Sequence, residues 1–196
     1  NETLAELENT SSVIRLELNT IELPLFSKDP KRIKNQIKIY HFKTDKSSYL
    51  EIEAPANYSI PGEFEERVFI ALTKIMKNNN YSRSFVVSAN EILETLGLSN
   101  KAYYKRIREA LTLLSKTNYT FLNSLYSNKE SGIIEKKIIS SIMNITIISK
   151  KDSRAKEIEA FGDGRIKEVY EINFTDYFYE NIIRKGYLAF DSGKLL

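Results

Sequence analysis

The sequence contains no cysteine, no tryptophan and a single histidine, His41. Without cysteine the chain has no disulfide, no thiolate metal ligand and no cysteine nucleophile. One histidine alone makes neither a zinc site nor a histidine-dependent acid–base pair, and no group of acidic residues has metal-ligand spacing. Gly162 and Gly164 lack the surroundings of a phosphate-binding loop. We therefore expect no metal, no cofactor and no enzymatic activity.

Long hydrophobic runs are also missing. No apolar run approaches the roughly 20 residues that a membrane-spanning helix needs, and no signal-peptide pattern is present. We expect no membrane partner and a cytoplasmic location. The length of 196 residues suits one large domain, or one domain with an extension. A net charge of +3 permits nucleic-acid binding, so the distribution of the charges must decide whether it is expected.

The segment from Phe64 to Tyr119 has the pattern of a helix, an extended stretch, a second helix, a tight turn and a basic helix. Apolar residues at helical spacing predict the first helix over residues 63–77. Ser88 and Glu91 have the spacing of a capping box, which predicts the start of the second helix. Gly97 supplies the left-handed residue that ends it. This order, followed by strands, is typical of a winged helix-turn-helix.

The basic helix is expected over residues 101–117, with Asn100 or Ser99 as its cap. Its spacing predicts one buried stripe, formed by Tyr103, Ile107, Ala110, Leu111 and Leu114. The residues predicted to bind DNA are at the start of the helix, on the opposite side and on its flank: Asn100, Lys101, Tyr104, Lys105, Arg106, Arg108 and Thr112. Cations crowd the N-terminal half, which is unfavourable for an isolated helix and would be relieved by phosphate. The alternative is a charged face that is merely solvated.

Strands are expected over residues 36–43 and 48–54 as a hairpin, over 118–126 and 133–149 as a second hairpin, and over 166–174. The loop 150–165 would be the tip of the wing, with Lys150, Lys151, Arg154 and Lys156 near the DNA; an ordinary surface loop is the alternative interpretation. A short helix is predicted from Thr175 or Asp176 to Lys185, and a strand over 187–190.

These expectations give an α+β fold: a winged helix-turn-helix with an N-terminal β-hairpin extension and a C-terminal helix and strand. We expect residues 1–20 to form an arm, either a short helix or disordered. Residues 21–175 form the DNA-binding domain, and residues 176–196 lead out of it.

Several segments resemble plasmid replication initiator proteins of the RepA kind. They are residues 65–72, 92–97, 104–114, 117–119, 169–174 and 186–191. The resemblance implies two winged-helix domains that bind repeated sequences at a plasmid origin, with residues 60–175 in the first. It places the end of this chain where the second domain would begin, so the chain resembles an N-terminal part. It also implies a homodimer and contacts with host replication proteins.

Three functional hypotheses follow from the sequence. The first is a non-catalytic initiator domain that binds double-stranded origin DNA through the basic helix. The second is a winged-helix transcriptional regulator that ends near Leu196 and binds a promoter operator as a dimer. The third is a winged helix that binds proteins, with a basic face exposed only to solvent.

Overall fold

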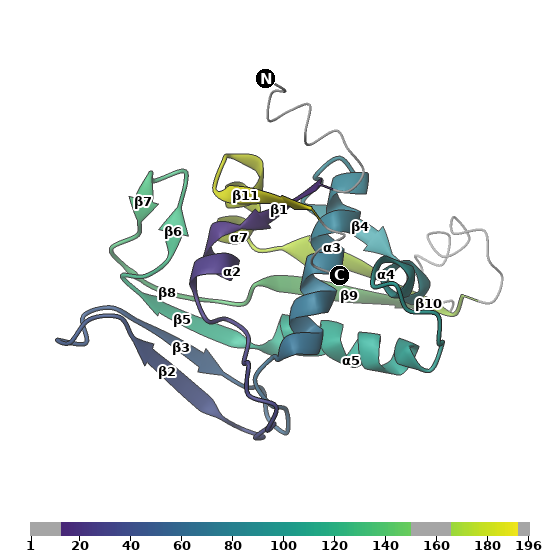
Figure 1. Cartoon of the computed structure of the whole chain (residues 1–196), viewed down its shortest axis with the longest axis horizontal. Coiled ribbons are helices and arrows are strands. Elements are labelled where there is room, and N and C mark those ends of the chain that lie inside the picture. Colours follow the sequence, from purple (N-terminus) through teal and green to yellow (C-terminus); the bar gives the residue numbers. More distant parts are fainter. Residues whose placement is uncertain (1–12, 150–165, 192–196) are drawn as a thin grey trace.

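The structure, a computed structural model, describes residues 13–149 and 166–191 and has the predicted α+β class (Figure 1). Its helices are α2 (Leu18–Glu22), α3 (Glu63–Asn78), α4 (Ala89–Thr95), α5 (Tyr103–Lys116) and α7 (Asp176–Ile183). Its strands are β1 (Val13–Glu17), β2 (Ile37–His41), β3 (Tyr49–Glu53), β4 (Ser84–Val87), β5 (Asn118–Leu122), β6 (Tyr126–Ser127), β7 (Gly132–Ile133), β8 (Lys137–Ser140), β9 (Met143–Ser149), β10 (Glu168–Phe174) and β11 (Tyr187–Asp191).

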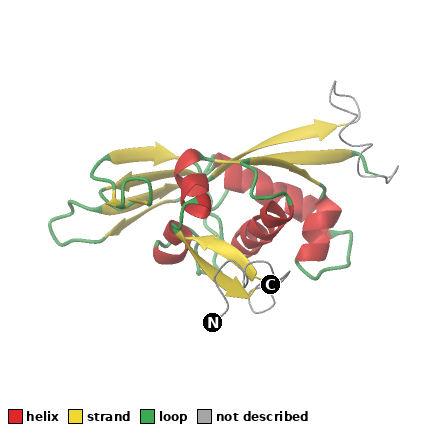
Figure 2. Ribbon diagram, turned by 90° about the horizontal axis from the view of Figure 1, so that it is seen from above, coloured by secondary structure: helices red, strands yellow, loops and turns green. Residues whose placement is uncertain are grey.

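Helices α3, α4 and α5 lie on one side of a three-stranded antiparallel sheet with the order β4-β10-β9. Figure 2 shows these helices beside the long strand pair that leads into the grey segment. Helix α3 begins where the sequence predicts, and its acids favour the positive end of the helix dipole. The backbone N–H of Gly62 donates to Glu65 Oε2 over 3.1 Å. These local signals therefore place α3 correctly in the sequence.

The predicted capping box at the start of α4 is confirmed. The backbone N–H of Glu91 donates to Ser88 Oγ over 3.1 Å, and the backbone N–H of Ser88 donates to Glu91 Oε2 over 3.4 Å. Gly97 has a φ of 71°, so the helix ends through the left-handed residue expected there. The Leu98 N–H then donates to the Leu93 carbonyl over 3.0 Å, which keeps the connection to α5 short.

A second, four-stranded sheet has the order β2-β3-β5-β8 and extends away from the helices (Figure 1). The predicted hairpin of β2 and β3 is confirmed. The expected single strand over residues 133–149 is wrong, because it divides into β7, β8 and β9, which belong to three different sheets. The chain changes sheet at Ile142, which is fully buried and whose carbonyl accepts from the Thr175 N–H and hydroxyl. This buried crossover is not visible in a run of β-branched residues.

The two ends of the described chain pair with each other, since β1 and β11 form an antiparallel ladder. Residues 13–20 of the expected arm and 176–191 of the expected exit segment therefore lie on the body of the molecule. Ile14 and Leu16 are buried from β1, and Phe178 and Ile182 are buried from α7. The scattered apolar residues of these segments bury themselves against each other and the core, which overrides their polar composition.

A buried carboxyl group ties these segments together. The side-chain amides of Asn19 and Asn181 donate to Glu17 Oε1 over 2.6 and 2.7 Å, and the Thr20 N–H donates to Glu17 Oε2 over 3.0 Å. Both amides also donate to the carbonyl of Tyr126. The network joins β1, α2, α7 and β6 and satisfies the acceptors that folding removes from water.

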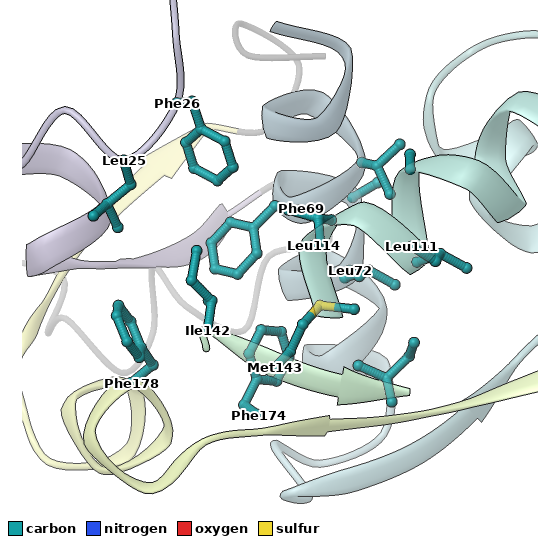
Figure 3. Packing of buried hydrophobic residues seen from close by; sticks show 14 of the residues in the cluster. Leu25, Phe26, Phe69, Leu72, Leu111, Leu114, Ile142, Met143, Phe174 and Phe178 are labelled. Atoms are coloured by element: carbon teal, nitrogen blue, oxygen red, sulfur yellow. The ribbon is translucent and has the colours of Figure 1, made fainter. Parts of the chain in front are cut away.

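One hydrophobic core serves both large sheets (Figure 3). Phe69 of α3 lies at its centre, with ring centroids 5.9 Å from Phe26 and 5.6 Å from Phe174. Figure 3 shows Leu111 and Leu114 of α5 and Phe178 of α7 around the same space. In residues 13–149 and 166–191, no helix is both long and apolar enough to cross a bilayer.

Candidate nucleic-acid interface

Helix α5 buries the predicted stripe and exposes the predicted cations. Ile107, Ala110, Leu111 and Leu114 are buried, and Tyr103 is half-buried. Lys101, Lys105, Arg106 and Arg108 are exposed, as are Asn100 and Glu109, while Tyr104 and Thr112 are half-buried. Leu113 is also buried, which the stripe did not include. Hydrophobic spacing therefore orients the helix correctly.

Asn100 has a local structural role. Its Oδ1 accepts from the Ala102 N–H over 2.9 Å, and its carbonyl accepts from the Tyr103 N–H over 3.1 Å. Helix α5 begins at Tyr103, two residues later than the sequence predicts, and the predicted cap at Asn100 or Ser99 is wrong, because Ala102 precedes the helix and offers no side-chain cap. Lys101 lies in the turn just before the helix, exposed to solvent.

Tyr104 and Arg106, both predicted to bind DNA, contact side chains of the neighbouring helices. The Tyr104 hydroxyl donates to Asn90 Oδ1 over 2.9 Å, which joins α5 to α4. The Arg106 guanidinium lies 3.9 Å from the ring centroid of Phe64 and 5.9 Å from that of Tyr103. A cation over an aromatic face at these distances is stabilising, so Arg106 covers the start of α3.

Arg108 reaches from α5 to the first residue of β10. Its Nε lies 3.1 Å from Glu168 Oε1, and the two side chains are 52% and 30% exposed. The Tyr170 hydroxyl donates to the same oxygen over 2.6 Å. Burial raises the pKa of Tyr170 well above its ordinary value, so this hydroxyl keeps its proton at neutral pH. The three side chains connect the basic helix to the strand that returns from residues 150–165.

The Lys105 side chain is far more exposed than that of Arg108. Its Nζ lies 4.0 Å from Glu109 Oε1, and the two side chains are 87% and 59% exposed. An ion pair this open to water contributes little, so Lys105 is available to a partner of opposite charge. Among the described residues, Lys101 makes no ion pair.

A groove of about 570 Å³ lies between α5, β9 and the loop before α3. It is lined by Tyr58, Lys105, Arg108, Glu109, Thr112, Ser115, Lys116, Ile145 and Ile147. Lys116 Nζ lies 5.9 Å from the ring centroid of Tyr58. The sequence prediction missed Lys116, although it is one turn after Thr112 on the same face. It also missed Tyr58 and Glu168, for which helical spacing offers no signal.

Strands β9 and β10 pair over their whole length, from Met143 with Phe174 to Ser149 with Glu168. The strand expected over residues 166–174 is therefore present, and it pairs with the last part of the segment expected as a strand over residues 133–149. The contact residues predicted for the wing, Lys150, Lys151, Arg154 and Lys156, lie outside the described residues.

Outside α5, the described residues offer few groups that could form a functional site. His41 is exposed, with its ring centroid 6.1 Å from that of Tyr49. Within residues 13–149 and 166–191, no three side chains of the metal-ligating types come together. The cationic face of α5 is therefore the strongest candidate for a functional surface.

No protein-family model matches this sequence, and no curated protein matches it either. Two crystal structures of domains 2 and 3 of RctB have a similar fold, each at 14% sequence identity. Their TM-scores are 0.55 and 0.54, and the similarity covers 82% and 84% of this chain. It covers 57% and 58% of the RctB chains, so this chain spans less than two thirds of their length. At this identity the comparison shows a shared fold.

Proposed function

We propose that this chain is a non-catalytic DNA-binding part of a replication initiator and that α5 is its recognition helix. The observation that carries the proposal is the exposed cationic face of α5, held by its apolar face against α3, α4 and β9. The proposed ligand is double-stranded DNA. A plasmid origin, a homodimer and contacts with host replication proteins belong to the same proposal and rest on the sequence resemblance.

The arrangement of elements supports a winged helix. Helix α3, strand β4, helices α4 and α5, and the hairpin of β9 and β10 follow each other in the order of that motif. Strands β5 to β8 are an insertion between α5 and the hairpin. Such motifs place their last helix in the major groove. The hairpin beside α5 would then lie near the DNA backbone.

The electrostatics of α5 support a phosphate-rich partner. Lys105 and Arg108 lie in its first two turns and Lys101 lies just before it, where the helix dipole is positive, and the first turn contains no acid. The arrangement is unfavourable in the isolated protein and favourable beside an anionic backbone. Within the described fold, Glu168 offsets the charge of Arg108, and Glu109 lies beside Lys105 at a distance of 4.0 Å.

Domains 2 and 3 of RctB share this fold at 14% identity, and the proposed role in replication rests on the sequence resemblance to plasmid initiators. The shared fold covers more than four fifths of this chain. The sequence resemblance favours the initiator over the transcriptional regulator, whose expectation rested on the motif alone.

The proposal predicts salt-dependent binding that depends on Lys101 and Lys105. Replacing both with alanine should weaken binding to any duplex and lower the slope of log K against log salt by about two, roughly one for each lost phosphate contact. Fluorescence anisotropy with a labelled random-sequence duplex of about 30 base pairs at several salt concentrations would measure this slope.

Lys129 and Lys136 provide the matched control, because both are exposed and lie near β6 to β8, far from α5 (Figure 1). Their double alanine variant loses the same charge and should keep the wild-type slope. Equal salt slopes for the wild type and both double variants would show that α5 is not part of the DNA interface. Absence of salt-sensitive binding by the wild-type protein would favour a protein-binding module instead.

A further inference from the structure

The ion pair between Arg108 and Glu168 is at odds with a simple phosphate contact. Glu168 lies against Nε of the guanidinium and is itself held by the Tyr170 hydroxyl. A phosphate bound by Arg108 would lie close to this carboxylate, and two like charges at that distance repel each other. An arginine that makes backbone contacts alone gains nothing from such a partner.

The same geometry suits contact with a base. Arginine recognises guanine through two donors aimed at O6 and N7, which are uncharged acceptors in the major groove. Anchoring Nε leaves the two terminal nitrogens for this contact. In the described parts of the chain, no acceptor other than Glu168 is within bonding distance of the Arg108 guanidinium. The anchor also removes rotamer freedom before binding, which reduces the entropy lost in the complex.

The position of Arg108 agrees with this role. It lies in the second turn of α5, with Lys105 about one turn before it, and it lines the groove beside β9. Lys105 and Lys101 can contact the backbone while Arg108 reaches the base edges. The carboxylate that contacts the Arg108 guanidinium belongs to Glu168, the first residue of β10.

We propose that Glu168 is a positioning residue that holds Arg108 to read one guanine in the major groove. The inference rests on the proposed DNA-binding function and deepens it, since it assigns one specificity determinant. Tyr170 completes the arrangement by orienting the carboxylate. The acid on β10 thereby turns a general cation of α5 into a sequence-reading side chain.

The test is selection of bound sequences from a pool of random duplexes by four proteins: the wild type, Arg108→Ala, Arg108→Lys and Glu168→Ala. The wild type should select a G·C pair at one position. Arg108→Ala should lose that preference. Arg108→Lys should lose it but keep the salt slope, because lysine retains the charge without the two-pronged geometry. Replacing the selected guanine with 7-deazaguanine should weaken wild-type binding about tenfold or more and leave Arg108→Ala unaffected.

Glu168→Ala separates positioning from simple support of the fold. It removes a negative charge near the DNA, so binding to non-specific duplex should stay equal or become tighter, while discrimination at the guanine position falls about tenfold. A merely structural role would weaken binding to all duplexes alike. Tyr170→Phe, which retains the ring and removes the hydroxyl, should show a smaller loss of discrimination and serves as the second variant.

The outcomes distinguish the two proposals. Salt-sensitive binding with unchanged discrimination in Glu168→Ala and Tyr170→Phe would overturn the role of Glu168 and leave the DNA-binding function intact. A uniform loss of affinity in Glu168→Ala, or a wild type that selects no guanine, would also overturn it. A wild type that binds no duplex would overturn the DNA-binding function itself.

Discussion

The cations of α5 differ in what surrounds them, although they belong to one charged face. Arg106 lies over Phe64, Arg108 is paired with Glu168, and Lys105 is almost free in water. These environments suit three different roles, which are covering the core, directed recognition and phosphate contact. Residue type and spacing alone did not separate these roles.

Glu17 is a buried acid whose ionisation affects stability around neutral pH. Burial raises its pKa from 4.5 to about 7, although three hydrogen-bonding neighbours oppose the shift. Between those two values the folded protein holds a proton that the unfolded chain has released. This stabilisation is fully present below pH 4.5 and is lost as the pH rises through about 7. The full change amounts to about 3 kcal/mol.

We therefore expect the free energy of unfolding to fall between about pH 5 and pH 8, and Glu17→Gln to flatten this dependence. Urea unfolding of both proteins across that range would measure it. The glutamine variant should be less stable at low pH, because the NH2 that replaces Oε2 cannot accept from the Thr20 N–H. The exposed Glu53 gives a control, since Glu53→Gln should follow the wild-type curve. An unchanged pH dependence in Glu17→Gln would exclude Glu17 as its source.

At the scale of elements, the local signals that define α4 lie outside the proposed DNA interface on α5. Capping at Ser88 and the left-handed Gly97 define α4, which contributes no predicted DNA contact. Helix α4 instead supports α5, through packing and through the hydrogen bond from Tyr104 to Asn90. The stability of α4 and the electrostatics of α5 should therefore be separable by mutation.

Ser88→Ala should lower the free energy of unfolding by about 1 kcal/mol, because the Glu91 N–H loses its cap. Thermal and urea unfolding would measure the change. The salt slope of duplex binding should remain as in the wild type, since no phosphate contact is removed. Ser99→Ala, at an exposed position of the next turn, should leave stability nearly unchanged. Equal stability of the Ser88 and Ser99 variants would contradict the assigned cap.

At the scale of the whole molecule, one core joins both large sheets, helices α3 to α5 and helix α7. Phe69 contacts aromatic rings from the N-terminal segment and from β10. A cavity at Phe69 should therefore destabilise both large sheets and the helices together. The insertion of β5 to β8 should accordingly unfold together with the helices.

Phe69→Ala should lower the free energy of unfolding by about 3–5 kcal/mol, because it leaves a large cavity at the centre of the core. Hydrogen exchange should show that β5 and β10 lose protection in the same transition. Phe42→Ala, at a position 43% exposed, should change stability by no more than about 0.5 kcal/mol. Separate unfolding of the four-stranded sheet would show two cooperative units instead of one.

Local sequence signals determined where α3 and α4 begin and which face of α5 is buried, but they misplaced the cap of α5. Amphipathic spacing chose which residues of α3 and α5 are buried, because the helical period leaves one side for the core. The capping box and Gly97 marked the ends of α4, since they satisfy backbone groups within a few residues. The hairpin of β2 and β3 was also predictable, because both strands and the loop between them lie within one short stretch of sequence.

Only the tertiary structure decided the crossover at Ile142, the pairing of β1 with β11, and the partners of the cations. Glu168 lies 60 residues after Arg108, and Asn181 lies 164 residues after Glu17. Contacts over such distances depend on how sheets stack and where the chain crosses between them, and no short-range period encodes this. The sequence could therefore identify a basic amphipathic helix, whereas the carboxylate beside its arginine became visible only in the folded chain.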